Sequence, residues 1–320
     1  MGRLHWCDVV RAAACVMVVI LHAAGPFVPV NSSGGWLTMP ALLEAATRPA
    51  VPLFFMLSGY LWLSRDSDVT LESSTGRLMR SAIPGLFYTL VYAIFLHFVL
   101  NMSIPNPLTV PVFYHLWFFY AYLVVAGLLL VVRPSNATPG MGIVINCLIL
   151  LIFAGGMSVF GLGHAFETVS GSALYLIYAL AGFFVGQVKL SRSSALLAGI
   201  VFSAGVVLTA YLTNRVSLPA GGLDQRYYGY NASIVVVMSF ASFYLLRYLG
   251  EKVQFGAPVV RNISAASLGI FGLHPLILHF CLEQLGRDRL SFLLVSAVPL
   301  LAAWAIATGL RHIPYGKWIA

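Results

Sequence analysis

The chain has 320 residues, of which 60% are hydrophobic and only 9% are charged. A soluble domain carries about 25% charged residues, so this composition excludes a soluble fold. The net charge of +8 comes from single basic residues spread among apolar blocks, and the four cysteines lack metal-ligand spacing. We therefore expect a membrane protein with no nucleic-acid partner and no bound metal.

The apolar blocks are about 20 residues long, which is the length of an α-helix that crosses a bilayer. Strands of a membrane β-barrel would instead be about 10 residues of alternating polarity. We expect an all-α integral membrane protein with about ten transmembrane helices in a single domain, 1–320, with no appended soluble domain. The expected spans are 9–28, 41–63, 82–101, 113–132, 141–162, 172–188, 194–213, 230–249, 265–284 and 290–310.

Ten spans place both termini on the same side of the membrane. Twelve Lys and Arg residues fall on that terminal side and four on the other, while Arg11 and Arg48 lie within spans. Basic residues are enriched in cytoplasmic loops, so both termini are predicted to be cytoplasmic.

The first span carries three ionisable residues, Asp8, Arg11 and His22. Asp8 and Arg11 are three residues apart and can pair on one helix face. His22 follows Arg11 by eleven residues, which places it within about 20° of that face and about 16 Å farther along the axis. One helix face thus combines a charged pair near the cytoplasm with a base deep in the outer half, although a hydrogen-bonded interior histidine would give the same pattern.

The span 41–63 places Arg48 in its outer half, at a depth comparable to that of His22. Glu44, four residues earlier, can neutralise Arg48 in a structural ion pair. The alternative is that Arg48 binds an oxygen-rich substrate or stabilises an oxyanion beside His22. Both interpretations fit the sequence.

Arg77 and Arg80 stand three residues apart in the loop before Pro84, which we expect to open the next span. Two guanidinium groups on one helical face suit phosphate groups. They also suit contact with anionic lipid at the cytoplasmic surface.

Further hydrogen-bonding groups lie near the predicted outer side. His115 and Trp117 open the span 113–132, and Asn231 opens the span 230–249. His274 lies about ten residues into the span 265–284.

Together these blocks resemble membrane-bound acyltransferase family 3, whose members O-acylate cell-envelope polysaccharides and other substrates. The resemblance covers almost the whole chain. It rests on Asp8-x-x-Arg11 followed by His22, on Arg48 to Trp62 with its Phe-Phe-x-x-Ser-Gly core, on Arg77-x-x-Arg80 before Pro84, on His115-Leu-Trp-Phe, and on the block from Ser267 to Pro275.

The resemblance implies that His22 is the catalytic residue and that Arg11 supports it or the acyl donor, with Asp8 as the third member of the catalytic group. It also implies that acyl-CoA, with acetyl-CoA the commonest donor in the family, is bound by Arg77, Arg80 and Ser58. The residues expected to contact the acceptor are Arg48, His115, Trp117, Asn231 and His274.

The implied activity moves an acyl group from cytoplasmic acyl-CoA to a hydroxyl of a glycan or lipid-linked sugar outside the bacterial cytoplasmic (inner) membrane. His22 would deprotonate the acceptor for direct attack, or the acyl group would pass through a covalent enzyme intermediate. The chain ends soon after the last span and so resembles the stand-alone form. That form acts on the glycan directly or hands the acyl group to a separate extracytoplasmic partner.

Two other classes of function use the same polar residues. A proton-coupled transporter or flippase of a glycan or small polar solute would place them along a translocation path, although we find no inverted repeat. A sensor or structural membrane protein would use them to hold helices together.

Overall fold

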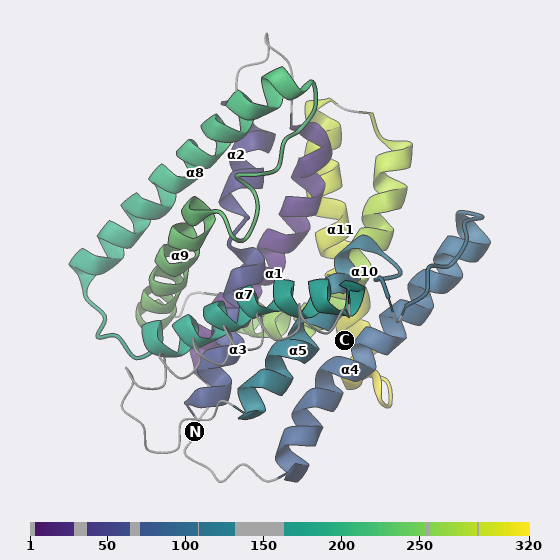
Figure 1. The fold of residues 1–320 in the computed structure, drawn as a ribbon, viewed down its shortest axis with the longest axis horizontal. Coiled ribbons are helices and arrows are strands. Elements are labelled where there is room, and N and C mark those ends of the chain that lie inside the picture. The colour runs from purple at the N-terminus through teal and green to yellow at the C-terminus, as the bar shows by residue number, and fades with distance from the viewer. Residues whose placement is uncertain are drawn as a thin grey trace. The chain divides into compact units, whose positions relative to one another are not determined.

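The computed structural model describes residues 4–28, 37–64, 71–107, 109–131, 163–253, 256–286 and 288–320. Every regular element in these ranges is helical, as the composition predicts (Figure 1). The longer helices are α1 (His5–Ala24), α2 (Met39–Ala46), α3 (Ala50–Leu63), α4 (Leu71–Ile94), α5 (Trp117–Val131), α7 (Gly163–Val185), α8 (Arg192–Ala220), α9 (Ser233–Lys252), α10 (Ala257–Gln284) and α11 (Arg289–Leu310). Short helical turns are η1 (Gly25–Phe27), η2 (Phe95–Val99), η3 (Tyr114–Leu116) and η4 (Gly316–Trp318).

Within the described residues, six helical segments are long and apolar enough to cross a membrane. They are His5–Phe27, Leu78–Val99, Arg192–Ala220, Ser233–Lys252, Ala257–Gln284 and Leu290–Leu310. Tyr114–Leu129 and Leu174–Val185 are shorter apolar helices at two further expected spans. The expected span 141–162 lies outside the described residues, so the count of ten stays a prediction.

Two helices, rather than one, occupy the expected span 41–63. Helix α2 ends at Ala46 and α3 begins at Ala50, with a turn at 47–49 between them. Pro49 has no N–H to donate to the preceding turn. The Thr47 hydroxyl donates to the carbonyls of Leu43 and Glu44, which gives the buried last turn of α2 hydrogen-bond partners.

Pro84 was expected to open a helix but lies inside α4, which begins at Leu71. Arg77 and Arg80 are therefore helical residues two turns or less before the proline rather than loop residues. Both residues lie in one helix, as the shared face requires. Residues three positions apart in a helix lie on nearly the same face.

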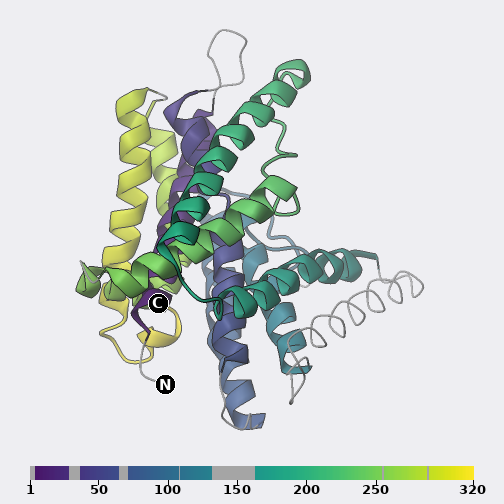
Figure 2. The same ribbon diagram turned by 90° about the vertical axis from the view of Figure 1, so that its left-hand side faces the viewer.

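The contacts divide the chain into two compact units. The first comprises residues 1–57 and 185–318 with Ala320, and the second comprises 58–184 with Ile319. In the first unit α1 packs against α2, α9, α10 and α11 (Figures 1 and 2). A Cβ built on Gly250 of α9 would lie 2.6 Å from the Trp6 Cα, so glycine allows the backbones of α9 and α1 to approach closely.

In the first unit, the start of α1 and the end of α11 lie on the same side. Asp8 near the start of α1 contacts Ser264 near the start of α10, and Arg311 after α11 donates to the Ala265 carbonyl. We call this the terminal side. Ten spans would also place both on one side, and the number of crossings stays a prediction.

Basic residues of the first unit gather on the terminal side. Arg11 and Arg48 lie within expected spans and are left out of this comparison. The other described basic residues on the terminal side are Lys189, Arg192, Arg247, Lys252, Arg261, Arg311 and Lys317. Those at the opposite ends of the helices are Arg215, Arg226 and Arg289. The asymmetry favours a cytoplasmic terminal side, and that orientation stays a prediction.

Candidate active site

Helix α1 presents one stripe of polar side chains to α10. Asp8, Cys15 and His22 are spaced by seven residues, so they lie on nearly the same face of a helix. The Ser264 hydroxyl donates to Asp8 Oδ1 over 2.7 Å, and Cys15 Sγ donates to the Ser267 carbonyl over 3.6 Å. The third member of the stripe, His22, meets His274.

The two histidines form the centre of the candidate site. His22 Nδ1 lies 2.8 Å from His274 Nε2, and His274 Nδ1 lies 3.0 Å from the Ile270 carbonyl oxygen. The ring planes differ by only 9°, with centroids 5.1 Å apart, so the nitrogens face each other within nearly parallel planes. His274 is fully buried and His22 is half-buried.

These contacts determine where the protons lie on neutral rings. A carbonyl oxygen only accepts, so His274 Nδ1 must donate to Ile270. His274 Nε2 is then the unprotonated nitrogen and accepts from His22 Nδ1–H. His22 in turn carries its lone pair on Nε2, which is the arrangement that a general base requires.

His274 is held by a hydrogen bond to its own helix, directly before Pro275. A proline inside a helix cannot donate to the carbonyl four residues earlier, so regular bonding in α10 is interrupted directly after His274. The His274 ring bonds back to Ile270, also four residues earlier, in the manner of polar side chains that back-bond within a helix. The side chain is thereby held at its Nδ1 end, and Nε2 points at His22.

A second polar group is built on Glu44 and Arg48. Both side chains are buried, with Glu44 3% and Arg48 7% exposed. Arg48 Nη2 donates to Glu44 Oε1, so the ion pair that the sequence allowed is present. The Arg48 guanidinium also lies over the Tyr228 ring, 4.1 Å from its centroid, and Nη1 donates to the Tyr228 carbonyl over 3.4 Å. Tyr228 is itself fixed in an apolar cluster with Ala45 of α2 and Ala210 of α8.

This ion pair keeps unused hydrogen-bonding capacity. Arg48 Nε and Glu44 Oε2 are buried and have no hydrogen-bond partner among the described residues. A Cβ built on Gly25 would lie 3.8 Å from the Glu44 carboxylate, and Gly25 follows His22 by three residues. The Glu44 carboxylate therefore lies beside the turn that follows His22 in the sequence.

Two other predicted residues of the first unit lie apart from these contacts. Arg11 is half-buried on α1 between Asp8 and His22. Asn231 is exposed in the loop that precedes α9. In the same loop, hydrogen bonds from Arg226 hold the pKa of the exposed Asp224 carboxyl below its ordinary value.

The predicted donor-binding residues belong to the second unit. Arg77 and Arg80 lie on α4, and the Arg80 side chain is exposed. Ser58 is half-buried on α3, next to Gly59. A Cβ on Gly59 would lie 1.8 Å from the Ala179 carbonyl oxygen, so the Ser-Gly step marks a close contact between α3 and α7.

His115 and Trp117 are enclosed by aromatic rings in the second unit. His115 is 1% exposed, and its ring centroid lies 4.8 Å from that of Tyr92 at an interplanar angle of 68°. Phe113 completes this group, with its centroid 5.8 Å from that of His115. The Trp117 ring lies 5.3 Å from Tyr175.

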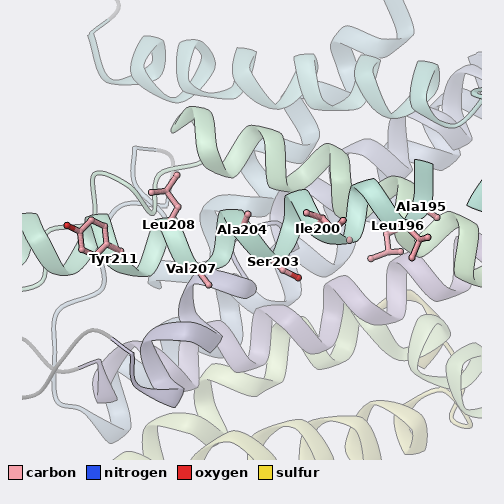
Figure 3. Close-up of a pocket in the computed structure, with 10 residues that line it drawn as sticks. Ala195, Leu196, Ile200, Ser203, Ala204, Val207, Leu208 and Tyr211 are labelled. Atoms are coloured by element: carbon pink, nitrogen blue, oxygen red, sulfur yellow. The ribbon is translucent and has the colours of Figure 1, made fainter. Parts of the chain in front are cut away.

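A groove of about 960 Å³ runs along α8, with apolar side chains from Ala195 to Tyr211 along it (Figure 3). Most of this lining belongs to a helix long and apolar enough to cross a membrane, and Leu196 and Ile200 are exposed. We expect lipid chains to cover the groove. The described residues also contain no group of three or more His, Cys, Asp or Glu side chains that could hold a metal ion.

The family model of acyltransferase family 3, described as an acyltransferase domain, matches residues 4–308. The chain belongs to this family. No curated protein and no solved structure matches it. The match includes both histidines, the Glu44–Arg48 pair and the two α4 arginines. With the apolar helices, it makes the chain a multi-pass membrane protein of an acyl-transferring family.

The sequence did not reveal two groups of this site. Tyr228 lies in an aromatic run, Tyr227-Tyr228-Gly229-Tyr230, that is equally typical of a membrane interface. The Ile270 carbonyl has no side-chain signature at all. Three polar residues of α10, Ser264, Ser267 and His274, are spaced by three and seven residues. This spacing could have predicted that α10 packs against the polar stripe of α1.

Proposed function

We propose that the protein transfers an acyl group, with acetyl the leading candidate, from acyl-CoA to a hydroxyl of a cell-envelope glycan. The observation that carries this proposal is the chain His22, His274, Ile270 carbonyl, which orients one histidine for base catalysis within an acyltransferase fold family. The bacterial cytoplasmic membrane, with both termini inside, is the proposed location.

His22 Nε2 takes the proton of the acceptor hydroxyl in the proposed reaction. The hydroxyl oxygen forms a bond to the thioester carbonyl carbon, the carbon–sulfur bond breaks, and the proton passes to the leaving CoA thiolate. Removal of a general base costs about a hundred- to ten-thousand-fold in rate. Arg11 supports His22 or the acyl donor in this proposal, and Asp8 links α1 to α10 through Ser264. A covalent acyl-enzyme would use the same base twice.

The Glu44–Arg48 pair is the proposed binding site for the acceptor. A sugar hydroxyl both donates and accepts, so it matches Glu44 Oε2 and Arg48 Nε, which lack partners in the described structure. Neighbouring hydroxyls on a sugar ring would supply a donor and an acceptor together. His115, Trp117 and Asn231 are kept as proposed acceptor contacts on the strength of the family resemblance.

Arg77, Arg80 and Ser58 are proposed to bind the donor. Arg77 and Arg80 share a helical face on α4, and each guanidinium contact to a phosphate contributes about 1.5 to 3 kcal/mol. The double variant Arg77→Ala/Arg80→Ala should lose acyl-CoA affinity by calorimetry in detergent. Arg192→Ala/Lys252→Ala removes the same charge from α8 and α9 and should leave the affinity unchanged. Equal affinity in both double variants would remove the phosphate role.

Mass spectrometry of envelope glycans tests the proposed function directly. Deleting the gene should remove one acyl increment from an identified glycan, and the wild-type gene should restore it. An unchanged glycan that is instead absent from the outer surface would favour a flippase.

A further inference from the structure

A basic cavity opens on the terminal side of the first unit, away from the two histidines. It measures about 830 Å³ and lies between the start of α10, the end of α11 and the segment after α11. Four of its lining residues carry basic side chains, Arg261, Arg311, His312 and Lys317, and none carries an acidic one. Neither the histidine pair nor the Glu44–Arg48 pair contributes to it.

The walls of this cavity are held by specific hydrogen bonds. Arg311 Nη1 donates to the carbonyls of Ala265, over 2.5 Å, and Ala320, over 3.1 Å, which ties the segment after α11 to α10. Asn262 Oδ1 accepts from Trp304 Nε1 over 2.7 Å and from the Thr308 hydroxyl over 3.1 Å. The basic groups therefore line a built hollow rather than separate flexible loops.

We propose that this cavity binds a phosphate group, carried by the headgroup of an anionic membrane phospholipid or by a soluble phosphorylated compound. Several cations that line one cavity, with no Asp or Glu among the lining residues, repel each other, and a multiply charged oxyanion relieves that repulsion. Basic pockets between helix ends at the cytoplasmic surface of membrane proteins bind phospholipid headgroups in this way.

Aromatic residues at the rim favour the lipid source. Tyr315 is 85% exposed and Trp318 is 43% exposed, and both line the cavity. Amphipathic rings of this kind settle at the level of lipid headgroups. Exposed Ile313 adds apolar surface beside them, where the acyl chains of a bound lipid would begin.

Native mass spectrometry of the purified full chain in detergent, titrated with phosphatidylglycerol or phosphatidylcholine, tests the proposal. A parallel arm measures the melting temperature with added inorganic pyrophosphate. Arg261→Gln/Lys317→Gln is the test variant, because both side chains are exposed and their loss leaves the hydrogen bonds of the walls in place. The control Arg192→Gln/Lys252→Gln removes the same two charges from the same side outside the cavity.

The wild type and the control should retain phosphatidylglycerol, with at least about tenfold weaker retention in the test variant. Phosphatidylcholine should bind weakly to all three, and Arg261→Lys/Lys317→Arg should bind like the wild type. Pyrophosphate could instead raise the melting temperature of the wild type and the control but not of the test variant, with no preference for phosphatidylglycerol. That result would support a phosphate site whose ligand is a soluble phosphorylated compound. Equal weakening in both Gln variants, or no selective binding by the wild type, would overturn the proposal.

Discussion

Replacing His274 with alanine or glutamine separates its role as a positioning residue from a role in packing. Alanine removes the Nε2 acceptor that lies 2.8 Å from His22 Nδ1. Glutamine offers a side-chain oxygen that can accept the same hydrogen bond. The two variants therefore differ in the one feature that orients the base.

The expected magnitude follows from the lost hydrogen bond. In the alanine variant the His22 Nδ1–H loses its partner, and a buried donor without a partner costs about 1 to 3 kcal/mol. The proton is then no longer confined to Nδ1, so part of the population has Nε2 protonated and cannot act as a base. A penalty of that size on the reactive arrangement lowers kcat by about ten- to hundredfold.

The assay measures transfer of labelled acetyl from acetyl-CoA to purified envelope glycan, with the protein in nanodiscs. We expect His274→Ala to lower kcat while KM for acetyl-CoA stays unchanged, and His274→Gln to recover most of the loss. Cys15→Ala is the control, because it alters the same α1–α10 interface seven residues from His22. It should keep near wild-type kcat.

Equal activity in the alanine and wild-type proteins would refute the tautomer argument. An equal loss in the alanine and glutamine variants, with normal melting temperatures, would also refute it, because acceptance of the His22 proton would then not be the relevant property.

Three further predictions concern stability, measured as thermal unfolding in detergent. Glu44→Ala leaves the buried Arg48 charge unpaired and should destabilise the protein by about 3 to 5 kcal/mol, with Glu44→Gln less damaging; equal melting temperatures would contradict this. Gly59→Ala forces a methyl group into a neighbouring helix backbone and should cost about 1 to 3 kcal/mol or more, whereas Gly199→Ala, with open space around it, should be neutral or stabilising. The Asp288 pKa is lowered by hydrogen bonds at the start of α11. Its stabilisation is therefore present above the ordinary aspartate pKa and is lost on acidification, so the deficit of Asp288→Ala should shrink as the pH falls; a constant deficit would contradict this.

Composition and block length predicted the helical membrane fold, because burial in lipid leaves few alternatives to apolar helices. The sequence did not correctly predict the helix bounds near two prolines. Pro49 lies between two helices, whereas Pro84 lies inside one.

The site was predictable where residues share one helix. The eleven-residue spacing of Arg11 and His22 on α1 follows from helix geometry alone. Glu44 and Arg48 pair at the four-residue spacing that helix geometry suggested, although Arg48 lies in the turn after α2. The contact between His22 and His274 joins residues 252 positions apart, which no local periodicity can indicate. His274 was predicted as a substrate contact, which stays a prediction, and its contact with His22 supports the further proposed role of orienting the base.

The glycan profile of cells that carry His22→Gln in place of the wild-type gene tests the central claim most directly. Glutamine keeps hydrogen-bonding capacity but cannot accept and return a proton, so base catalysis should be lost while the folded protein persists in the membrane. We predict that the acyl increment on the envelope glycan disappears with His22→Gln at wild-type protein levels. Retention of most of the acylation would contradict the assignment of His22 as the base.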